Sequence, residues 1–345
     1  MRIAVTADIH LRESNPERLQ NLEALIRQLL SQEVHHLAIA GDLFDGADNS
    51  YAGFDSLAQR FPKIQFIVIA GNHDPDLRQD LFASGNIRVF VKPTLKRIDR
   101  LAILFLPYRE GSTIGEAISA FRNSERLRSC RWILVSHGDF PAPRPEANGG
   151  ERGYFPLTRE DLARFQPLKT ILGHIHVPNG TTAEVLYPGS PYPITSDEYG
   201  QRRLLVLDTK TAAVTELALT HPPVRVRAEI FLIPDGREEE QIGRRLQSIL
   251  AGQGPPEKLV VQAFLKGYSV SRRKARGYLE AFLSEKAIPC AGIDLQSLRD
   301  NDQESLAILA ETVRQRVAGL KLNYPEAEQL KQAVLEQALE IVYGA

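Results

Sequence analysis

Cysteine and net charge are both scarce in this chain of 345 residues. Its two cysteines, Cys130 and Cys290, are far apart and lack the CxxC spacing of a thiolate metal site, which argues against a disulfide framework. We expect both to be buried core residues. The formal net charge is -1, so the whole chain is not basic, and any nucleic-acid partner would have to meet a local basic patch.

Long hydrophobic runs are absent as well. No stretch approaches the roughly 18 consecutive apolar residues that a membrane-spanning helix requires. The first residues reach Asp8 before the apolar region of a signal peptide could form, and they predict a short buried strand. We therefore expect a soluble, cytoplasmic protein without a membrane partner.

Short apolar runs, in contrast, recur through the first two thirds of the chain. They predict strands at 3–7, 36–40, 65–70, 101–106, 132–135, 169–172, 184–187 and 204–207. Helices are expected at 17–30, 51–60, 114–128 and 159–165, and a long loop at 140–155. This alternation predicts an α/β fold.

A second region begins after the segment His221-Pro222-Pro223, which is typical of a linker. Strands at 224–232 and 258–264 alternate there with helices at 238–250 and 271–285, which predicts a small α+β domain. Two helices at 304–317 and 326–343 form a terminal pair. We expect domains at 1–220, 221–296 and 297–345. Residues 222–296 carry 12 basic and 9 acidic side chains, so this part has the local positive charge that the whole chain lacks.

Five polar clusters stand at the ends of predicted strands. They are Asp8-Ile9-His10, Gly41-Asp42, Gly71-Asn72-His73-Asp74, Ser136-His137-Gly138-Asp139 and Gly173-His174-Ile175-His176. Each one alone also suits an ordinary turn, since Asn, Asp and Gly favour turn geometry. Together they place five of the eight histidines at the sheet edge where sites are built. Carboxylate, imidazole and amide groups without thiolate suit manganese, iron or zinc.

These residue types favour a centre with two metal ions. Asp8 and Asp42 supply negative charge, and Asp42 is the candidate bridge that would hold two ions ~4 Å apart. His174 and His176 are two residues apart in a predicted extended segment, so both rings should point to one side and serve the two ions separately. Close approach of the backbone is expected at three glycines, Gly41, Gly71 and Gly173.

The ordered motifs resemble those of the calcineurin-like metallophosphoesterases: D-x-H, G-D, G-N-H-D/E, a His before Gly, and G-H-x-H. The resemblance covers about residues 1–210. Residues 41–45, 173–176 and 187–191 are similar to the SbcD branch of DNA double-strand-break repair nucleases. The resemblance implies a two-sheet core covered by helices, with a small α+β capping domain and a C-terminal helical pair.

The resemblance also implies roles for individual residues. One metal ion would be held by Asp8, His10, Asp42 and His176, and the other by Asp42, Asn72, His137 and His174. Manganese is the ion it implies. His73 would be the catalytic histidine, and Asp74 would orient it. Asp45 stands where archaeal and eukaryotic relatives often carry a second histidine, which matches the bacterial branch.

Two features of the second region point to partners. A basic group at the start of a predicted helix, Arg272, Arg273, Lys274 and Arg276, suits phosphate contacts with DNA, although a solvated helix face is equally consistent with it. The last helix has an apolar face that either packs on its own chain or docks a partner helix. The resemblance implies an SbcC-like coiled-coil ATPase as partner and leaves a homodimer open.

We therefore expect a manganese-dependent nuclease acting at DNA ends, with 3′ to 5′ exonuclease and single-strand endonuclease activity in double-strand-break repair. Two alternatives stay open. One is a metallophosphoesterase acting on a cyclic nucleotide, a phosphoprotein or another small phosphoester. The other is a DNA-end tether for an ATPase, in which catalysis is secondary.

Overall fold

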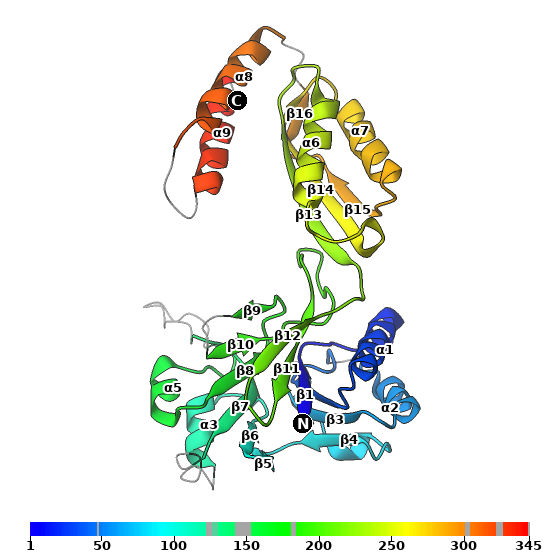
Figure 1. Cartoon of the computed structure of the whole chain (residues 1–345), viewed down its shortest axis with the longest axis vertical. Coiled ribbons are helices and arrows are strands. Elements are labelled where there is room, and N and C mark those ends of the chain that lie inside the picture. The colour runs from blue at the N-terminus through cyan, green and yellow to red at the C-terminus, as the bar shows by residue number, and fades with distance from the viewer. Residues whose placement is uncertain are drawn as a thin grey trace. The chain divides into compact units, whose positions relative to one another are not determined.

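The computed structural model describes residues 1–46, 48–121, 127, 130–141, 153–180, 184–300, 304–321 and 327–343. They form two compact units, Met1–Pro222 and Pro223–Ala345. The division falls within the predicted linker, two residues after the expected boundary at 220. Each unit has its own sheets and core, coloured blue to green and green to red in Figure 1.

The first unit contains two six-stranded sheets. In one of them the strand order is β12-β11-β1-β2-β3-β4. Strands β1 to β4 are parallel, and β11 runs antiparallel to both of its neighbours, β1 and β12. The bounds are β1 Arg2–Thr6, β2 His36–Ala40, β3 Gln65–Ile69, β4 Ile87–Phe90, β11 Arg203–Asp208 and β12 Val214–Ala218. Strands β4 and β12, absent from the sequence prediction, are edge strands with exposed positions that interrupt any apolar run.

The other sheet has the order β5-β6-β7-β8-β10-β9. Strands β6, β7, β8 and β10 are parallel, and β5 and β9 are antiparallel at the two edges. The bounds are β5 Thr94–Ile98, β6 Leu101–Phe105, β7 Trp132–His137, β8 Lys169–Gly173, β9 Asn179–Gly180 and β10 Val185–Tyr187.

The two sheets pack face to face between helices. One buried cluster lies between them and includes Val5 of β1 and Ile133 of β7. Helices α1 (Pro16–Ser31) and α2 (Tyr51–Arg60) cover the outer face of the first sheet, near the short helix η1 (Gln79–Leu81). Helices α3 (Ile114–Ala120) and α5 (Arg159–Phe165) cover the second. The expected two-sheet α/β core covered by helices is confirmed.

Local capping explains where several helices begin. Pro16 occupies the first turn of α1, where its missing N–H costs nothing. Thr158 and Asp161 form a capping box at the start of α5. Helix α3 was expected to reach residue 128 but ends at Ala120, because Phe121 turns to an extended backbone. Residues 122–126, and residues 142–152 of the expected long loop, lie outside the described part.

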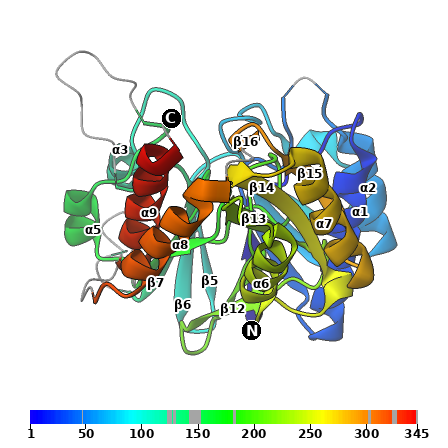
Figure 2. The same ribbon diagram turned by 90° about the horizontal axis from the view of Figure 1, so that it is seen from above.

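The second unit contains a four-stranded parallel sheet. Its elements are β13 Val224–Leu232, α6 Glu238–Leu250, η2 Pro256–Lys258, β14 Leu259–Ser269, α7 Arg272–Glu285, β15 Cys290–Asp294 and β16 Leu298–Asp300. Both β15 and β16 pair with β14, so the sheet continues past the expected domain boundary at 296. Helices α6 and α7 lie side by side and pack on the sheet (Figure 2).

Helices α8 (Glu304–Ala318) and α9 (Ala327–Tyr343) form the predicted terminal pair (Figure 2). Ala310 of α8 and Leu339 of α9 are buried with Ile233, which follows β13. The expectation that both cysteines are buried is wrong, since Cys290 is exposed and Cys130 is only partly buried. In the part of the chain that is described, no helix combines the length and apolarity needed to cross a membrane.

Candidate metal centre

Five loops of the first unit bring the polar clusters together at one edge of the two sheets. The side chains come from the ends of β1, β2, β3, β7 and β8: Asp8 and His10, Asp42, Asn72, His137, and His174 and His176. Strands β1 to β3 are parallel, as are β7 and β8, so their carboxyl ends meet at common edges. His137 links the sheets, because its Nδ1 lies 2.9 Å from the carbonyl oxygen of Ala40.

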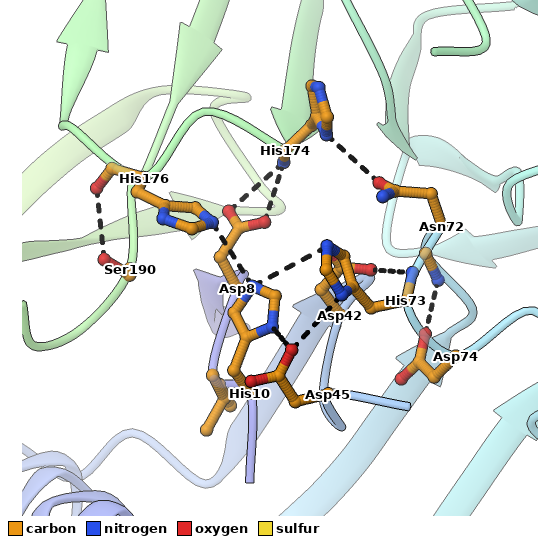
Figure 3. Close-up of polar contacts among 12 residues, drawn as sticks. Asp8, His10, Asp42, Asp45, Asn72, His73, Asp74, His174, His176 and Ser190 are labelled. Carbon is orange, nitrogen blue, oxygen red and sulfur yellow. Dashed lines mark hydrogen bonds and ion pairs between the residues drawn. The ribbon is translucent and has the colours of Figure 1, made fainter. Parts of the chain in front are cut away.

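One group of candidate ligands consists of Asp8, His10 and His176. One potential ligand atom from each lies within 4.8 Å of the others. The Nε2 atoms of His10 and His176 are 3.2 Å apart and face each other in Figure 3. Two imidazole nitrogens at this distance can share a proton or a cation between them.

A second group consists of Asp42, His137 and His174, again within 4.8 Å. The amide oxygen of Asn72 lies 2.8 Å from Nε2 of His137 and 3.1 Å from Nδ1 of His174. An Asp42 carboxylate oxygen is 3.3 Å from Nε2 of His137 and 3.7 Å from Nε2 of His10. Asp42 therefore lies between the two groups, as expected of a bridging carboxylate.

The electrostatics of the centre favour a bound cation. Burial alone would raise the pKa of Asp42, but His137 and His10 lower it below its ordinary value, so the carboxylate is ionised. Burial would lower the pKa of His137, but Asp42 and Asp8 raise it to about 9. The same negative charge attracts metal ions, and the carboxylate, imidazole and amide donors fit divalent ones.

Four candidate ligands have unusual backbone conformations. The φ angles are 55° at Asp8, 51° at His10, 52° at Asp42 and 101° at His174. Such positions cost about 1–3 kcal/mol each and cluster at functional sites. The prediction of an extended segment at His174 is therefore wrong: the positive φ turns its ring towards Asn72, whereas His176 reaches His10.

All three glycines expected to allow close approach do so, since a methyl group at Gly173 would overlap the carbonyl oxygen of Ala40. A methyl group at Gly41 would overlap the ring of His137, and one at Gly71 would overlap the carboxylate of Asp42. The sheet edge is thus too crowded for any side chain at these three positions.

His73 lies at the exposed rim of the centre. Asp74 was expected to orient it, but its two carboxylate oxygens instead accept hydrogen bonds from the backbone N–H groups of Gly71 and Phe44, at 2.7 and 3.1 Å. The carboxylate beside Nδ1 of His73 belongs to Asp45, at 3.2 Å. Asp74 therefore shapes the loop, and Asp45 contacts the histidine ring (Figure 3).

Glu198 is a buried member of the site that the sequence did not indicate. Its carboxylate lies 2.9 Å from Nδ1 of His176 and 3.0 Å from the guanidinium of Arg202. The hydroxyl of Ser190 and the backbone N–H of Ile194 also donate to it, at 3.3 and 3.0 Å. Burial opposes its ionisation, but the bond from His176 lowers the pKa of Glu198 below its ordinary value. Glu198 thus orients His176 from behind.

His174 has neighbours of its own from the loop after β7. A carboxylate oxygen of Asp139 lies 3.3 Å from its Nε2. The ring of the exposed Tyr154 lies 4.9 Å from the His174 ring, and its backbone N–H donates to Asp139 at 2.7 Å. Asp139 belongs to a cluster that the sequence singles out, but no role was predicted for it.

The four basic residues predicted to meet DNA lie in the first turns of α7, in the second unit. The guanidinium of Arg272 donates to the carbonyl oxygen of Leu295, and that of Arg276 to Glu280, both at 2.8 Å. Arg273 and Lys274 are exposed on the same helix. These two side chains suit contacts with phosphate groups best.

Comparison with known proteins places these observations in a family. Residues 1–205 match the family model described as calcineurin-like phosphoesterase. The SbcD subunit of the nuclease SbcCD from Rhodobacter capsulatus is 27% identical over 259 residues, which cover 58% of this chain and 64% of that protein. A DNA double-strand break repair protein Mre11 from Methanopyrus kandleri is 24% identical over 294 residues, covering 72% and 62%.

The chain thus spans slightly less than two thirds of the length of these curated relatives. Among solved structures, a dimetal phosphatase from Danio rerio aligns with a TM-score of 0.38 at 13% identity, covering 64% of this chain and 99% of that one.

Proposed function

Since this chain belongs to the calcineurin-like phosphoesterase family, we propose that it is a manganese-dependent nuclease that hydrolyses phosphodiester bonds at DNA ends. The observation that carries the proposal is the position of Asp42 between two groups of ligands, which suits a pair of metal ions sharing one carboxylate. The curated relatives are named as nuclease and DNA-break repair proteins, which supports DNA as the substrate.

We assign the ligands as two sets that share Asp42. Asp8, His10, Asp42 and His176 form one set, and Asp42, Asn72, His137 and His174 form the other. Divalent ions bound there would neutralise phosphate charge and lower the pKa of a bound water towards neutrality. Oxygen and imidazole donors without thiolate are compatible with manganese.

His73 acts as the catalytic histidine in this proposal. Asp45 holds Nδ1, so the other ring nitrogen is the one that donates a proton to the leaving oxygen or stabilises its charge. The side chain is 46% exposed, which leaves it accessible to a polymeric substrate. Asp74 supports this role through the backbone of its loop.

The second unit supplies the partners in this proposal. The exposed cations of α7 contact the DNA backbone, and α8 and α9 bind an SbcC-like coiled-coil ATPase. Exposed apolar side chains support the second assignment: Ile308 and Ile341 are 78% and 77% exposed. The complex would trim DNA ends by 3′ to 5′ exonuclease and single-strand endonuclease cleavage.

The test uses the full chain, stripped of metal and resupplied with Mn²⁺. It is incubated with linear duplexes labelled at either end and, separately, with bis(p-nitrophenyl) phosphate. The His73→Ala protein is the control, because it should keep its metal ions and lose turnover about 10²–10⁴-fold.

Each outcome separates the candidate functions. Shortening of the duplex by the native protein alone supports the nuclease, and the labelled end gives the polarity. Cleavage of the small ester with intact DNA would favour an enzyme for small phosphodiesters. Tight DNA binding without metal and without turnover of either substrate would favour a DNA-end tether. Equal turnover by the His73→Ala protein would remove the role assigned to His73.

A further inference from the structure

A cavity of about 400 Å³ lies in the first unit. Its walls come from three segments: residues 91–93 after β4, residues 106–109 after β6, and the end of α3. Its volume lies within the roughly 300–1,000 Å³ typical of pockets that bind small molecules.

Sheet topology places this cavity beside the metal centre. Strand β4 is the parallel neighbour of β3, which leads to Asn72, and β6 is the parallel neighbour of β7, which ends at His137. The cavity is therefore one strand further out on each sheet, at the same carboxyl edge as the ligands. The backbone N–H of Tyr108 donates to the carbonyl oxygen of Ala70 at 3.0 Å, which ties the cavity wall to the loop that carries Asn72.

Tyr108 separates the cavity from the metal ligands. It lines the cavity, and its ring stands perpendicular to the ring of His137 with the centroids 6.5 Å apart. The ring of Tyr108 also packs against that of Phe155, with the two ring centroids 5.9 Å apart. A substrate that extends from the metal centre into the cavity would pass this ring.

The lining combines apolar surfaces with two cations. Leu106, Pro107 and Phe121 supply apolar surface, and Lys92 and Arg109 are exposed basic side chains. Within the residues that the structure describes, neither of these two side chains forms an ion pair or hydrogen bond with a protein group. Apolar and aromatic walls suit the faces of a nucleobase, and unpaired cations suit phosphate.

We propose that this cavity binds the nucleotide next to the scissile phosphate. Its base packs against Pro107 and Phe121, and its phosphate contacts Lys92 and Arg109. The inference rests on the proposed nuclease function, and it adds a subsite that is selective for nucleotides over simple phosphodiesters.

The first test measures binding of thymidine 5′-monophosphate to the metal-free protein by calorimetry, so that the metal centre cannot hold the phosphate. Lys92→Gln and Arg109→Gln should each weaken binding at least about tenfold, the loss expected for one charge-assisted hydrogen bond. Lys96→Gln is the matched control. Lys96 is an exposed lysine on β5, and its Nζ lies 5.5 Å from the centroid of the Phe90 ring. The Lys96→Gln protein should bind the nucleotide as tightly as the native protein does. Equal affinity in all four proteins, or no binding by the native one, would overturn the proposal.

The second test compares kcat/KM for two esters in the presence of Mn²⁺. Thymidine 5′-(p-nitrophenyl phosphate) offers a base, and bis(p-nitrophenyl) phosphate does not. The preference for the first ester should fall at least about tenfold in the Lys92→Gln and Arg109→Gln proteins and stay unchanged in Lys96→Gln. An unchanged preference in all of them would contradict the subsite. Because the binding test needs neither DNA nor turnover, failure of the nuclease assignment and failure of the subsite give different results.

Discussion

The carboxylate of Asp45 lies 3.2 Å from Nδ1 of His73, and the same oxygen lies 3.2 Å from Nδ1 of His10. One acidic group thus contacts both the candidate catalytic histidine and a candidate metal ligand. Burial would raise the pKa of Asp45, but the neighbouring His10, Arg12 and Arg18 side chains lower it below its ordinary value, so Asp45 is ionised. Its charge thus lies beside the Nδ1 atom of both rings.

We expect Asp45→Asn to reduce turnover about 10–100-fold, the usual cost of removing a group that orients a ligand from behind. The amide keeps the shape of the side chain but not its charge. The measurement is kcat for a phosphodiester, with Mn²⁺ affinity determined on the same protein. Asp48→Asn is the control on the same loop, since Asp48 accepts a hydrogen bond from the backbone of Ser14 outside the centre. Native turnover in Asp45→Asn would exclude the orienting role.

Glu198→Gln should weaken one of the two metal sites and spare the other. Its carboxylate contacts His176, which belongs to only one ligand set, so Mn²⁺ affinity at that site should fall about 10–100-fold. Titration of Mn²⁺ into the metal-free protein, followed by calorimetry, resolves the two binding events. Glu216→Gln, which changes a surface carboxylate paired with Arg203, should leave both unchanged. If the Glu198→Gln protein binds both Mn²⁺ ions with native affinity, Glu198 does not position His176.

Gly71→Ala should destabilise the loop after β3 and disturb the metal centre. The added methyl group would overlap the carboxylate of Asp42, and overpacking of this kind typically costs about 1–3 kcal/mol. Scanning calorimetry and Mn²⁺ titration check the two effects. Gly85→Ala is the matched control, because its methyl group would meet no atom within 4 Å. Equal Tm values and metal affinities in the two variants would contradict the crowding seen at Gly71.

The sequence predicts the candidate metal ligands better than the residues that orient them. Polar clusters directly after buried strands indicate the candidate ligands, because parallel strands bring their carboxyl ends to common edges. Glu198 lies 22 residues from His176, and no local spacing links the two. The contact between Asp45 and His73 joins two separate loops, so the adjacent Asp74 was the natural but incorrect partner. Such contacts depend on tertiary packing alone.

The same reasoning explains which parts of the fold were missed. Central strands are buried and form continuous apolar runs, so the sequence predicts them within one or two residues, and β2 at its observed bounds. Strands β5 and β12 expose much of their surface, and β16 has only three residues, so apolar runs do not mark them. The positive φ of His174 cannot be predicted from the pattern of residue types.

The exposed cations of α7 should act through phosphate contacts if the second unit binds DNA. Exchanging both Arg273 and Lys274 for Gln should weaken binding of a labelled duplex. The association constant for DNA falls as salt rises, and the steepness of log K against log salt concentration should decrease by about 0.9 for each lost phosphate contact. Fluorescence anisotropy on the metal-free protein measures this without cleavage. Arg244→Gln with Lys286→Gln removes the same charge from other exposed positions of this unit. Equal slopes in the two double variants would mean that net charge, and not the start of α7, determines DNA binding.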